Sequence, residues 1–124
     1  VLLHSITDSI YGALSFGDIG KHFPPSQKKW KNYDSAFFLK HAARELYKRK
    51  GKIIHIDVVV ITEIPKISTY SKKISKNISK LLNINEKIIS IKGKSNEGIG
   101  VIGRKEGIAV FTNSTLSLKE KNGF

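Results

Sequence analysis

The segment from Ile53 to Thr62 constrains the fold of this chain more strongly than any other stretch. Its sequence, IIHIDVVVIT, is almost continuously apolar and rich in β-branched residues, which pack well on a pleated surface. Such runs are typical of strands in the centre of a sheet, and we predict a central strand here. Asp57 breaks the pattern. Because a buried carboxylate needs partners, we interpret it as lying on a half-exposed face of the strand together with His55.

Helical spacing and turn residues predict the elements on either side of this strand. The first helix begins near Leu2 and runs into a loop bracketed by Gly17 and Gly20. The other expected elements are a surface segment over 25–33, a helix from Ala36 to about Lys50, a helix from about Thr69 to Leu82, a strand from Ile88 to Lys92, a glycine-rich loop from Lys94 to Arg104, a strand from about Gly107 to Leu118 and a frayed tail over 119–124. This order predicts an α/β sandwich in which helices cover one sheet face, and the uncovered face argues for self-association.

Composition narrows the class of protein and the kinds of site. A chain of 124 residues with 40% hydrophobic content forms one domain with a core. It has no cysteine, so a metal site has to use histidine and carboxylate ligands. No apolar run reaches the ~20 residues that a membrane-spanning helix needs. The chain opens on Val1 inside a helix-like segment, and we expect further residues upstream of it.

The net charge of +12 has two interpretations. Clustered basic residues would indicate a module that binds RNA or another polyanion. However, only three of the 22 basic residues are arginine, and the lysines are scattered along the chain, which fits a solvated lysine-rich surface. A basic α/β module that binds RNA or another polyanion without catalysis remains the alternative. Against it, Phe111 is the lone aromatic residue in the predicted strands, whereas RNA-binding sheets carry stacking pairs.

Three places in the chain have residues suited to chemistry. His4 and Asp8 lie one helical turn apart, as a metal ligand and the group that orients it would. The second place is the tight loop over 17–24. The third consists of two loops, the exit from the central strand at 64–66 and the glycine-rich loop from Lys94 to Arg104. The stretch from Gly93 to Gly100 offers backbone N–H groups, a hydroxyl, a lysine and a carboxylate, which can hold phosphate and Mg²⁺. Its spacing is not that of a Walker A loop, and as a bare pattern it is also typical of a hairpin connection.

Three segments, taken in order and with their spacing, resemble the 2-C-methyl-D-erythritol 2,4-cyclodiphosphate synthase family. They are LLHSITDSIYGALSFGDIGKHFP over 2–24, the strand and loop from Asp57 to Lys66, and GRKEGIAV from Gly103 to Val110. The most specific part is L-H-x-x-T-D followed by G-D-I-G-K-x-F-P. The resemblance covers nearly the whole chain.

The resemblance implies an α+β protomer with a mixed β-sheet and helices packed on one face, assembled as a homotrimer with active sites between subunits. Residues 1–124 would be a single synthase domain that lacks the family's N-terminal β segment. The implied activity is that of a lyase in non-mevalonate isoprenoid biosynthesis. The 2-phosphate of 4-diphosphocytidyl-2-C-methyl-D-erythritol 2-phosphate attacks the β-phosphate, CMP leaves, and a cyclic diphosphate forms. The implied cofactors are Zn²⁺ and a second ion, Mg²⁺ or Mn²⁺. Nucleic acid and membrane are not expected as partners.

The motifs carry the family's site residues onto this chain. His4 matches a zinc ligand and Asp8 its orienting partner; Ser95 matches the catalytic hydroxyl and Glu97 the ligand of the second ion. The residues that match substrate contacts are Asp18, Ile19 and Gly20 for the erythritol hydroxyls, Phe23, Pro24, Pro25, Ser26 and Gln27 beside them, Thr62, Glu63, Ile64, Pro65, Lys66, Ile67 and Ser68 for cytidine, Lys94 and Asn96 for the diphosphate, and Val101 and Arg104 near the trimer's inner surface, where Glu106 is an expected interface partner.

The chain also departs from the family pattern. The family's Asp-x-His pair of zinc ligands does not occur in it, and catalytic zinc normally takes three protein ligands. Pro25 and Gln27 stand at positions that are usually acidic, Lys94-Ser95-Asn96 replaces a run of threonines, and Lys105 replaces a glycine. A catalytically inactive member kept as a structural trimer is therefore a third interpretation. For location, the lysine- and isoleucine-rich composition fits a plastid (apicoplast-type) stroma, with the bacterial cytoplasm as the alternative.

Overall fold

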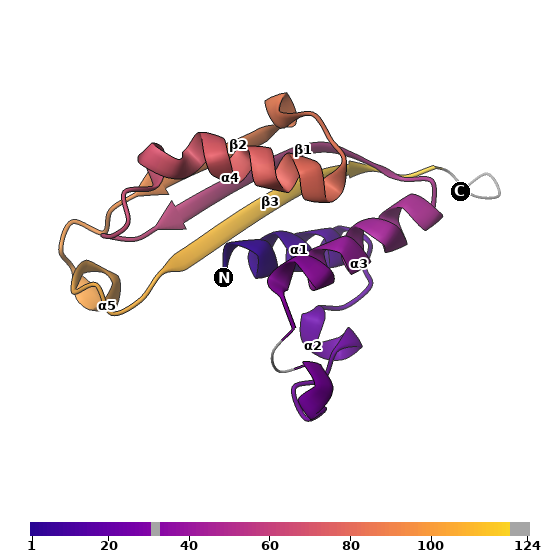
Figure 1. Ribbon diagram of the computed structural model, residues 1–124, viewed down its shortest axis with the longest axis horizontal. Helices are drawn as coiled ribbons and strands as arrows, with labels where there is room; N and C mark the ends of the chain where they lie inside the picture. Colours follow the sequence, from indigo (N-terminus) through magenta and orange to yellow (C-terminus); the bar gives the residue numbers. More distant parts are fainter. Residues whose placement is uncertain (31–32, 120–124) are drawn as a thin grey trace.

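A three-stranded mixed sheet forms the centre of the molecule (Figure 1). The computed structural model describes residues 1–30 and 33–119, so the expected tail lies outside the described residues except for its first position. The central strand β1 (Lys52–Ile61) pairs in parallel with β2 (Ile89–Lys94) and antiparallel with β3 (Ala109–Ser117). The predicted central strand is confirmed, because β1 lies between the other two.

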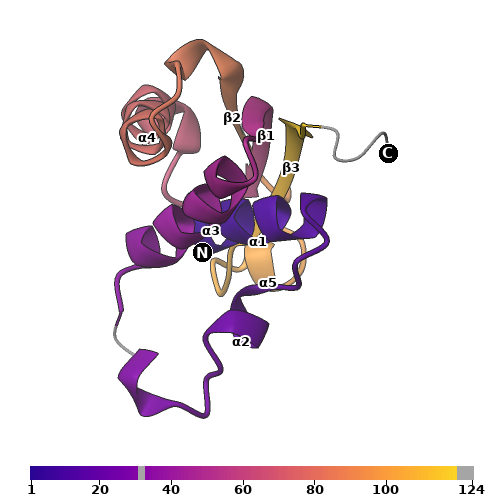
Figure 2. The ribbon, with the colours of Figure 1, turned by 90° about the vertical axis from the view of Figure 1, so that its right-hand side faces the viewer.

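Helices cover one face of this sheet, as Figure 2 shows from the end. They are α1 (Leu2–Ala13), α3 (Ser35–Lys48) and α4 (Ile67–Leu82). The side chains of β1 that point toward them, Ile56, Val58 and Val60, are buried. In α4 the apolar residues recur at helical spacing and its lysines face solvent, so one stripe packs on the sheet. The predicted α+β architecture, with a mixed sheet and helices on one face, is confirmed.

Small hydroxyl side chains join α1 to β3. Ser5 Oγ and Thr112 Oγ1 lie 2.7 Å apart, and Ser9 Oγ and Ser114 Oγ lie 2.5 Å apart. Because these side chains are short, the helix can approach the strand closely while its buried polar groups stay hydrogen-bonded. These bonds fix the position of α1, which carries His4 and Asp8.

The opposite face of the sheet is not covered by any described element. Asp57, Val59 and Ile61 of β1 point to this side and are half-buried, and Phe111 of β3 is 64% exposed. The carboxylate of Asp57 pairs with Lys92 Nζ at 3.2 Å, and its other oxygen is buried without a hydrogen-bond partner among the described residues. The interpretation of Asp57 as a half-exposed strand residue, with His55 on the same face, is confirmed.

The boundaries differ from the prediction where short helices occur. The additional elements are α2 (Ile19–His22), η1 (Lys28–Trp30), η2 (Glu86–Ile88) and α5 (Gly100–Gly103). Ile88, expected in a strand, ends η2, because Asn85 Oδ1 caps that turn by accepting from Lys87 N at 2.9 Å. The third long helix begins at Ile67 and not at Thr69. None of the helices in the described ranges is long and apolar enough to cross a membrane.

Candidate active site

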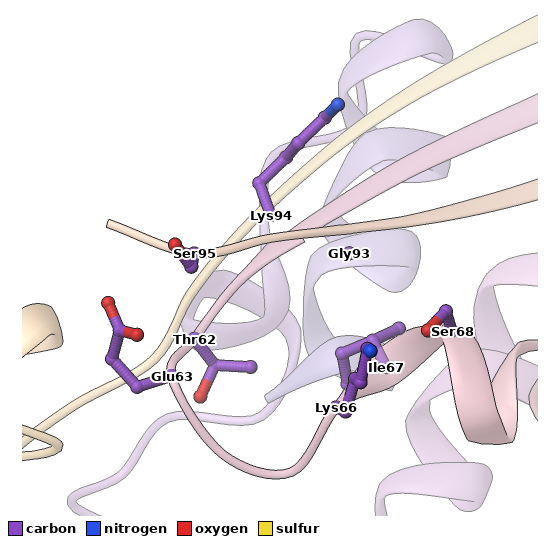
Figure 3. A pocket seen from close by; sticks show the side chains of 8 residues that line it. All are labelled: Thr62, Glu63, Lys66, Ile67, Ser68, Gly93, Lys94 and Ser95. Atoms are coloured by element: carbon purple, nitrogen blue, oxygen red, sulfur yellow. The ribbon is translucent and has the colours of Figure 1, made fainter. Parts of the chain in front are cut away.

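A cavity of about 290 Å³ lies where β1 and β2 end, beside the first turn of α4 (Figure 3). The carboxyl ends of parallel strands meet at one sheet edge, so residues far apart in sequence line one space. The lining residues are Thr62, Glu63, Lys66, Ile67, Ser68, Gly93, Lys94 and Ser95. Figure 3 shows Lys66, Ile67 and Ser68 on one side of it and Glu63 and Ser95 on the other, while the Lys94 ammonium points away from them.

The packing of α4 against β2 depends on a glycine. A Cβ atom at Gly93 would lie 2.6 Å from Cβ of Ile67, so a side chain there would push the first turn of α4 away from the strand. Thr62 fixes the other wall: its N–H donates to the Lys94 carbonyl (3.0 Å) and its hydroxyl to the Ile64 carbonyl (2.5 Å). The backbone around the cavity is thus held by contacts that are internal to this chain.

The loop that follows β2 carries the predicted catalytic hydroxyl and metal-binding carboxylate. Ser95 Oγ accepts a hydrogen bond from the backbone N–H of Glu97 at 3.1 Å, and both residues are exposed. Glu97 and Gly98 have φ angles of 54° and 73°. Two successive residues in the left-handed region turn the chain sharply and direct backbone N–H groups inward. Two N–H groups of the loop, those of Asn96 and Gly98, donate hydrogen bonds to Oε1 of Glu63.

Helix α5 supports the loop from its far side. A Cβ atom at Gly103 would lie 2.1 Å from the backbone carbon of Gly98, so the two backbones are in direct contact. Just beyond, Arg104 donates to Glu106 in two hydrogen bonds, of 2.9 Å from Nε and 3.4 Å from Nη2. Val101 is 52% exposed. Val101 and Arg104 therefore lie next to the loop but do not line the cavity.

The second group of predicted residues lies on α1 and α2. Asp8 Oδ1 accepts from Ile19 N at 2.9 Å, and Asp18 Oδ1 caps α2 by accepting from Lys21 N at 2.9 Å. His4 is exposed on α1, with its ring edge against Phe38 at 5.7 Å between centroids. The hydrogen bond that the structure gives Asp8 holds the glycine-bracketed loop and does not reach His4.

The segment that follows α2 is anchored by one aromatic side chain. Phe23 is buried, with its ring against Phe38 at 4.9 Å and His41 at 4.9 Å between centroids. Pro24 accepts a hydrogen bond from Gln27 N at 3.0 Å, which closes a turn. Pro25, Ser26 and Gln27 are exposed on that turn. Of this predicted group, Phe23 has a packing role and the others lie on the surface.

No motif pointed to a polar cluster between α1 and α3. Tyr11 Oη and His41 Nδ1 lie 2.5 Å apart, and the His22 ring stacks on Phe16 at 4.3 Å between centroids. Burial raises the pKa of Tyr11 to about 12, with smaller contributions from the carboxylates of Glu45 and Asp8. Burial also lowers the pKa of His41, which Glu45 partly opposes. The only sequence signal is the recurrence of aromatic and histidine side chains over 11–41.

The predicted site residues therefore fall into two groups in one chain. The cavity brings together Thr62, Glu63, Lys66, Ile67, Ser68, Lys94 and Ser95. His4, Asp8, the turn over 18–20 and the segment over 23–27 do not line it. Within residues 1–30 and 33–119, no group of three or more His, Cys, Asp or Glu side chains is placed to hold a metal ion. Because catalytic zinc normally has three protein ligands, His4 alone does not make a zinc site.

Comparison with known proteins relates this arrangement to one family. The model of the YgbB family matches residues 1–117. The apicoplast 2-C-methyl-D-erythritol 2,4-cyclodiphosphate synthase of Plasmodium falciparum is 49% identical over 116 residues, which are 94% of this chain and 48% of that protein. The 2-C-methyl-D-erythritol 2,4-cyclodiphosphate synthase of Prochlorococcus marinus is 45% identical over 121 residues, 98% of this chain and 72% of its own length. The chain thus spans about half the length of the Plasmodium relative.

Solved structures agree with the sequence relatives. A structure described as "IspF (Plasmodium falciparum) CDP complex" superposes with a TM-score of 0.87 at 48% identity, covering 97% of this chain and 72% of that one. The bifunctional IspDF of Campylobacter jejuni superposes with a TM-score of 0.91 at 37% identity, covering 97% of this chain and 32% of that one. The fold is therefore the one found in these enzymes.

Proposed function

Because the chain belongs to the YgbB family, we propose that it converts 4-diphosphocytidyl-2-C-methyl-D-erythritol 2-phosphate to 2-C-methyl-D-erythritol 2,4-cyclodiphosphate with release of CMP. The observation that carries the proposal is the placement of the cavity at the ends of β1 and β2 directly beside the loop with Ser95 and Glu97. A structural relative of 48% identity has CDP bound, which is the nucleotide part of this substrate. Two relatives named as synthases at 45–49% identity support the same reaction.

In this proposal the cavity takes the cytidine and the loop takes the diphosphate. The backbone from Thr62 to Ser68 offers N–H and C=O groups beside the apolar side chain of Ile67, which suits a planar base with polar edges. Lys66 is exposed at the cavity rim and supplies positive charge for a phosphate. Lys94 and Asn96 flank Ser95 on the loop. Val101 and Arg104 would contact the substrate only from the far side of that loop.

The chemistry is an intramolecular phosphoryl transfer. The 2-phosphate oxygen forms a bond to the β-phosphorus while the bond to the CMP oxygen breaks, and CMP leaves with the electron pair. Holding nucleophile and electrophile of one molecule in line supplies much of the rate, because their effective concentration is high. Ser95 Oγ can donate a hydrogen bond to the equatorial phosphate oxygens, on which charge is spread in the transition state.

The loop fits a divalent cation of the magnesium type. Mg²⁺ is usually bound through one or two carboxylates, substrate phosphates and several waters, so the single exposed carboxylate of Glu97 is sufficient protein ligation. We assign Glu97 to Mg²⁺ or Mn²⁺. When bound, such an ion neutralises the phosphate charge.

The zinc assignment rests on His4, around which the described residues of one chain gather no complete set of ligands. His4 is exposed and its ring is held by Phe38, so an imidazole nitrogen is accessible. Asp8 holds Ile19 through a hydrogen bond, which places the turn over 18–20 for contact with the erythritol hydroxyls. We assign His4 as one Zn²⁺ ligand, with Asp8 positioning this half of the site.

The two halves would meet between subunits of a homotrimer. The sheet face with Val59, Ile61 and Phe111 has apolar side chains and is uncovered in the protomer, which favours burial against other copies. In such an assembly the His4 half of one subunit faces the cavity and loop of its neighbour. We also propose that residues 1–124 belong to a single synthase domain. We further propose that the protein acts in an apicoplast-type plastid, as its relative from Plasmodium is named. Because a relative from a bacterium is also similar to this chain, the bacterial cytoplasm is the alternative location.

The test is CMP release. Full-length protein is incubated with the diphosphocytidyl substrate and Mg²⁺, and CMP and the cyclic diphosphate are quantified by mass spectrometry. We expect equal amounts of both products, and none when the 2-phosphate is missing from the substrate. A protein without CMP release that binds RNA tightly and in a salt-dependent way would support the polyanion-binding alternative, which the family relationship does not favour. A trimer that neither releases CMP nor binds RNA would support the third interpretation, a catalytically inactive structural protein.

A further inference from the structure

The carboxylate of Glu63, which lines the cavity, is hydrogen-bonded to the loop after β2. Its Oε1 atom accepts hydrogen bonds from Asn96 N at 2.9 Å and from Gly98 N at 3.2 Å. Figure 3 shows this side chain on the same side as Ser95 and across from Lys66. A single oxygen therefore joins the end of β1 to the loop across 33 and 35 positions of sequence.

The two N–H groups that donate to Glu63, those of Asn96 and Gly98, lie on either side of Glu97 in the sequence. Residues 97 and 98 have positive φ angles, a conformation that costs free energy for a non-glycine residue such as Glu97. A side-chain oxygen that accepts hydrogen bonds from two backbone N–H groups offsets that cost, because it holds the loop on both sides of Glu97 and satisfies both donors. On the far side the loop rests on the backbone of Gly103, so it is held from two directions.

From this geometry we infer that Glu63 is a positioning residue, which sets the Ser95–Glu97 loop for the diphosphate and its cation by bonding to the backbone on both sides of Glu97. The inference deepens the proposed function and rests on it for the identity of the reaction. It changes the role of Glu63 from a cytidine contact to a link between the nucleoside cavity and the phosphate loop. An acceptor oxygen is what the role requires, and its charge is of second importance.

Three variants of the full-length protein test this inference. Glu63→Ala removes the acceptor, Glu63→Gln keeps an oxygen at the same place, and Glu86→Ala is a matched control because Glu86 is a half-buried carboxylate in η2. Hydrogen exchange of the peptide over 95–99 is measured for each, together with the Mg²⁺ dependence of CMP release.

In Glu63→Ala we expect amide exchange of this peptide to be about ten- to hundred-fold faster, consistent with the loss of hydrogen bonds to a charged group. We expect the half-saturating Mg²⁺ concentration to rise and kcat to fall by about tenfold, while KM for the substrate changes by less than about threefold. Glu63→Gln should restore most of both properties, and Glu86→Ala should resemble the wild type in both.

Two outcomes would overturn the inference. One is unchanged exchange of residues 95–99 in Glu63→Ala. The other is a half-saturating Mg²⁺ concentration that rises as much in Glu63→Gln as in Glu63→Ala. That result would show that the negative charge of Glu63 is required. If the wild type releases no CMP, the proposed function fails, and the exchange measurement still decides whether Glu63 holds the loop. Should Glu63→Ala not fold, the comparison of Glu63→Gln with the wild type retains both readouts.

Discussion

At the scale of single residues, the candidate site depends on backbone conformations that side chains normally avoid. Lys105 has a φ angle of 65°, in the left-handed region that favours glycine. Its N–H donates to the Ile102 carbonyl at 3.0 Å, which closes the turn after α5. This residue therefore carries a conformational cost next to Arg104 and the loop.

Replacing Lys105 by glycine should stabilise the protein. We expect the free energy of unfolding to rise by about 0.5–1 kcal/mol, because removing the left-handed strain outweighs the extra entropy of glycine in the unfolded chain. Urea unfolding followed by circular dichroism measures the change. Lys87→Gly is the matched control, since Lys87 is exposed and does not have a positive φ angle, and it should not stabilise. A loss of stability in Lys105→Gly would contradict this account.

At the scale of elements, the contact between α1 and α3 predicts a pH dependence. Tyr11 Oη bonds to His41 Nδ1, and burial keeps the pKa of His41 below its usual value of 6.5. The groups that face His41 are Tyr11 and His22 from the N-terminal segment and Arg44, Glu45 and Lys48 from its own helix. Because burial and the cationic neighbours together outweigh Glu45, the folded state binds this proton less readily than the unfolded state.

Stability should therefore fall as the pH drops. Below about pH 6.5 the unfolded chain gains a proton on this histidine that the folded chain does not, so the free energy of unfolding declines until the folded pKa is reached. Urea unfolding between pH 5 and pH 8 measures the decline. His41→Gln removes the titrating group and should flatten the curve. Identical pH curves for the wild type and His41→Gln would show that this contact does not govern the dependence.

Long elements were predictable from the sequence because each carries a recognisable hydrophobic pattern over ten or more residues. The apolar run from Ile53 gave the central strand, and helical spacing gave α1, α3 and α4. Helices α2 and α5 have four residues each, too few for a period to be recognised, and both fell in segments expected to be loops. Their existence depends on local contacts, such as the Asp18 cap of α2.

The site was predictable only in part, because some of its contacts depend on local backbone conformation and packing that no sequence pattern indicates. Resemblance identified the segments that line the cavity, and it assigned Glu63 to the substrate. It did not indicate that Glu63 also accepts hydrogen bonds from Asn96 N and Gly98 N. The hydrogen bond that Gly98 N–H donates to Glu63 depends on the positive φ angle of Glu97. A glutamate in the sequence does not predict that conformation. The Tyr11–His41 pair likewise joins positions 30 residues apart and depends on how two helices pack.

At the scale of the whole molecule, the site residues of one chain lie in two groups that do not share a cavity. The cavity and loop would bind the nucleotide and the diphosphate, and α1 and α2 would supply His4 and the turn over 18–20. Our central claim is that a neighbouring copy brings these groups together. The claim predicts complementation between two inactive variants, because each can supply the half that the other lacks.

The most direct measurement uses His4→Ala and Glu97→Ala subunits that carry different affinity tags. The two are co-expressed and purified through both tags, so that every trimer is mixed, and CMP release is compared with that of each variant alone. Every mixed trimer then has one site with both His4 and Glu97 intact, and we expect about a third of the wild-type rate per trimer, while each variant alone is inactive. Mixed trimers with no more activity than the separate variants would contradict a site shared between subunits.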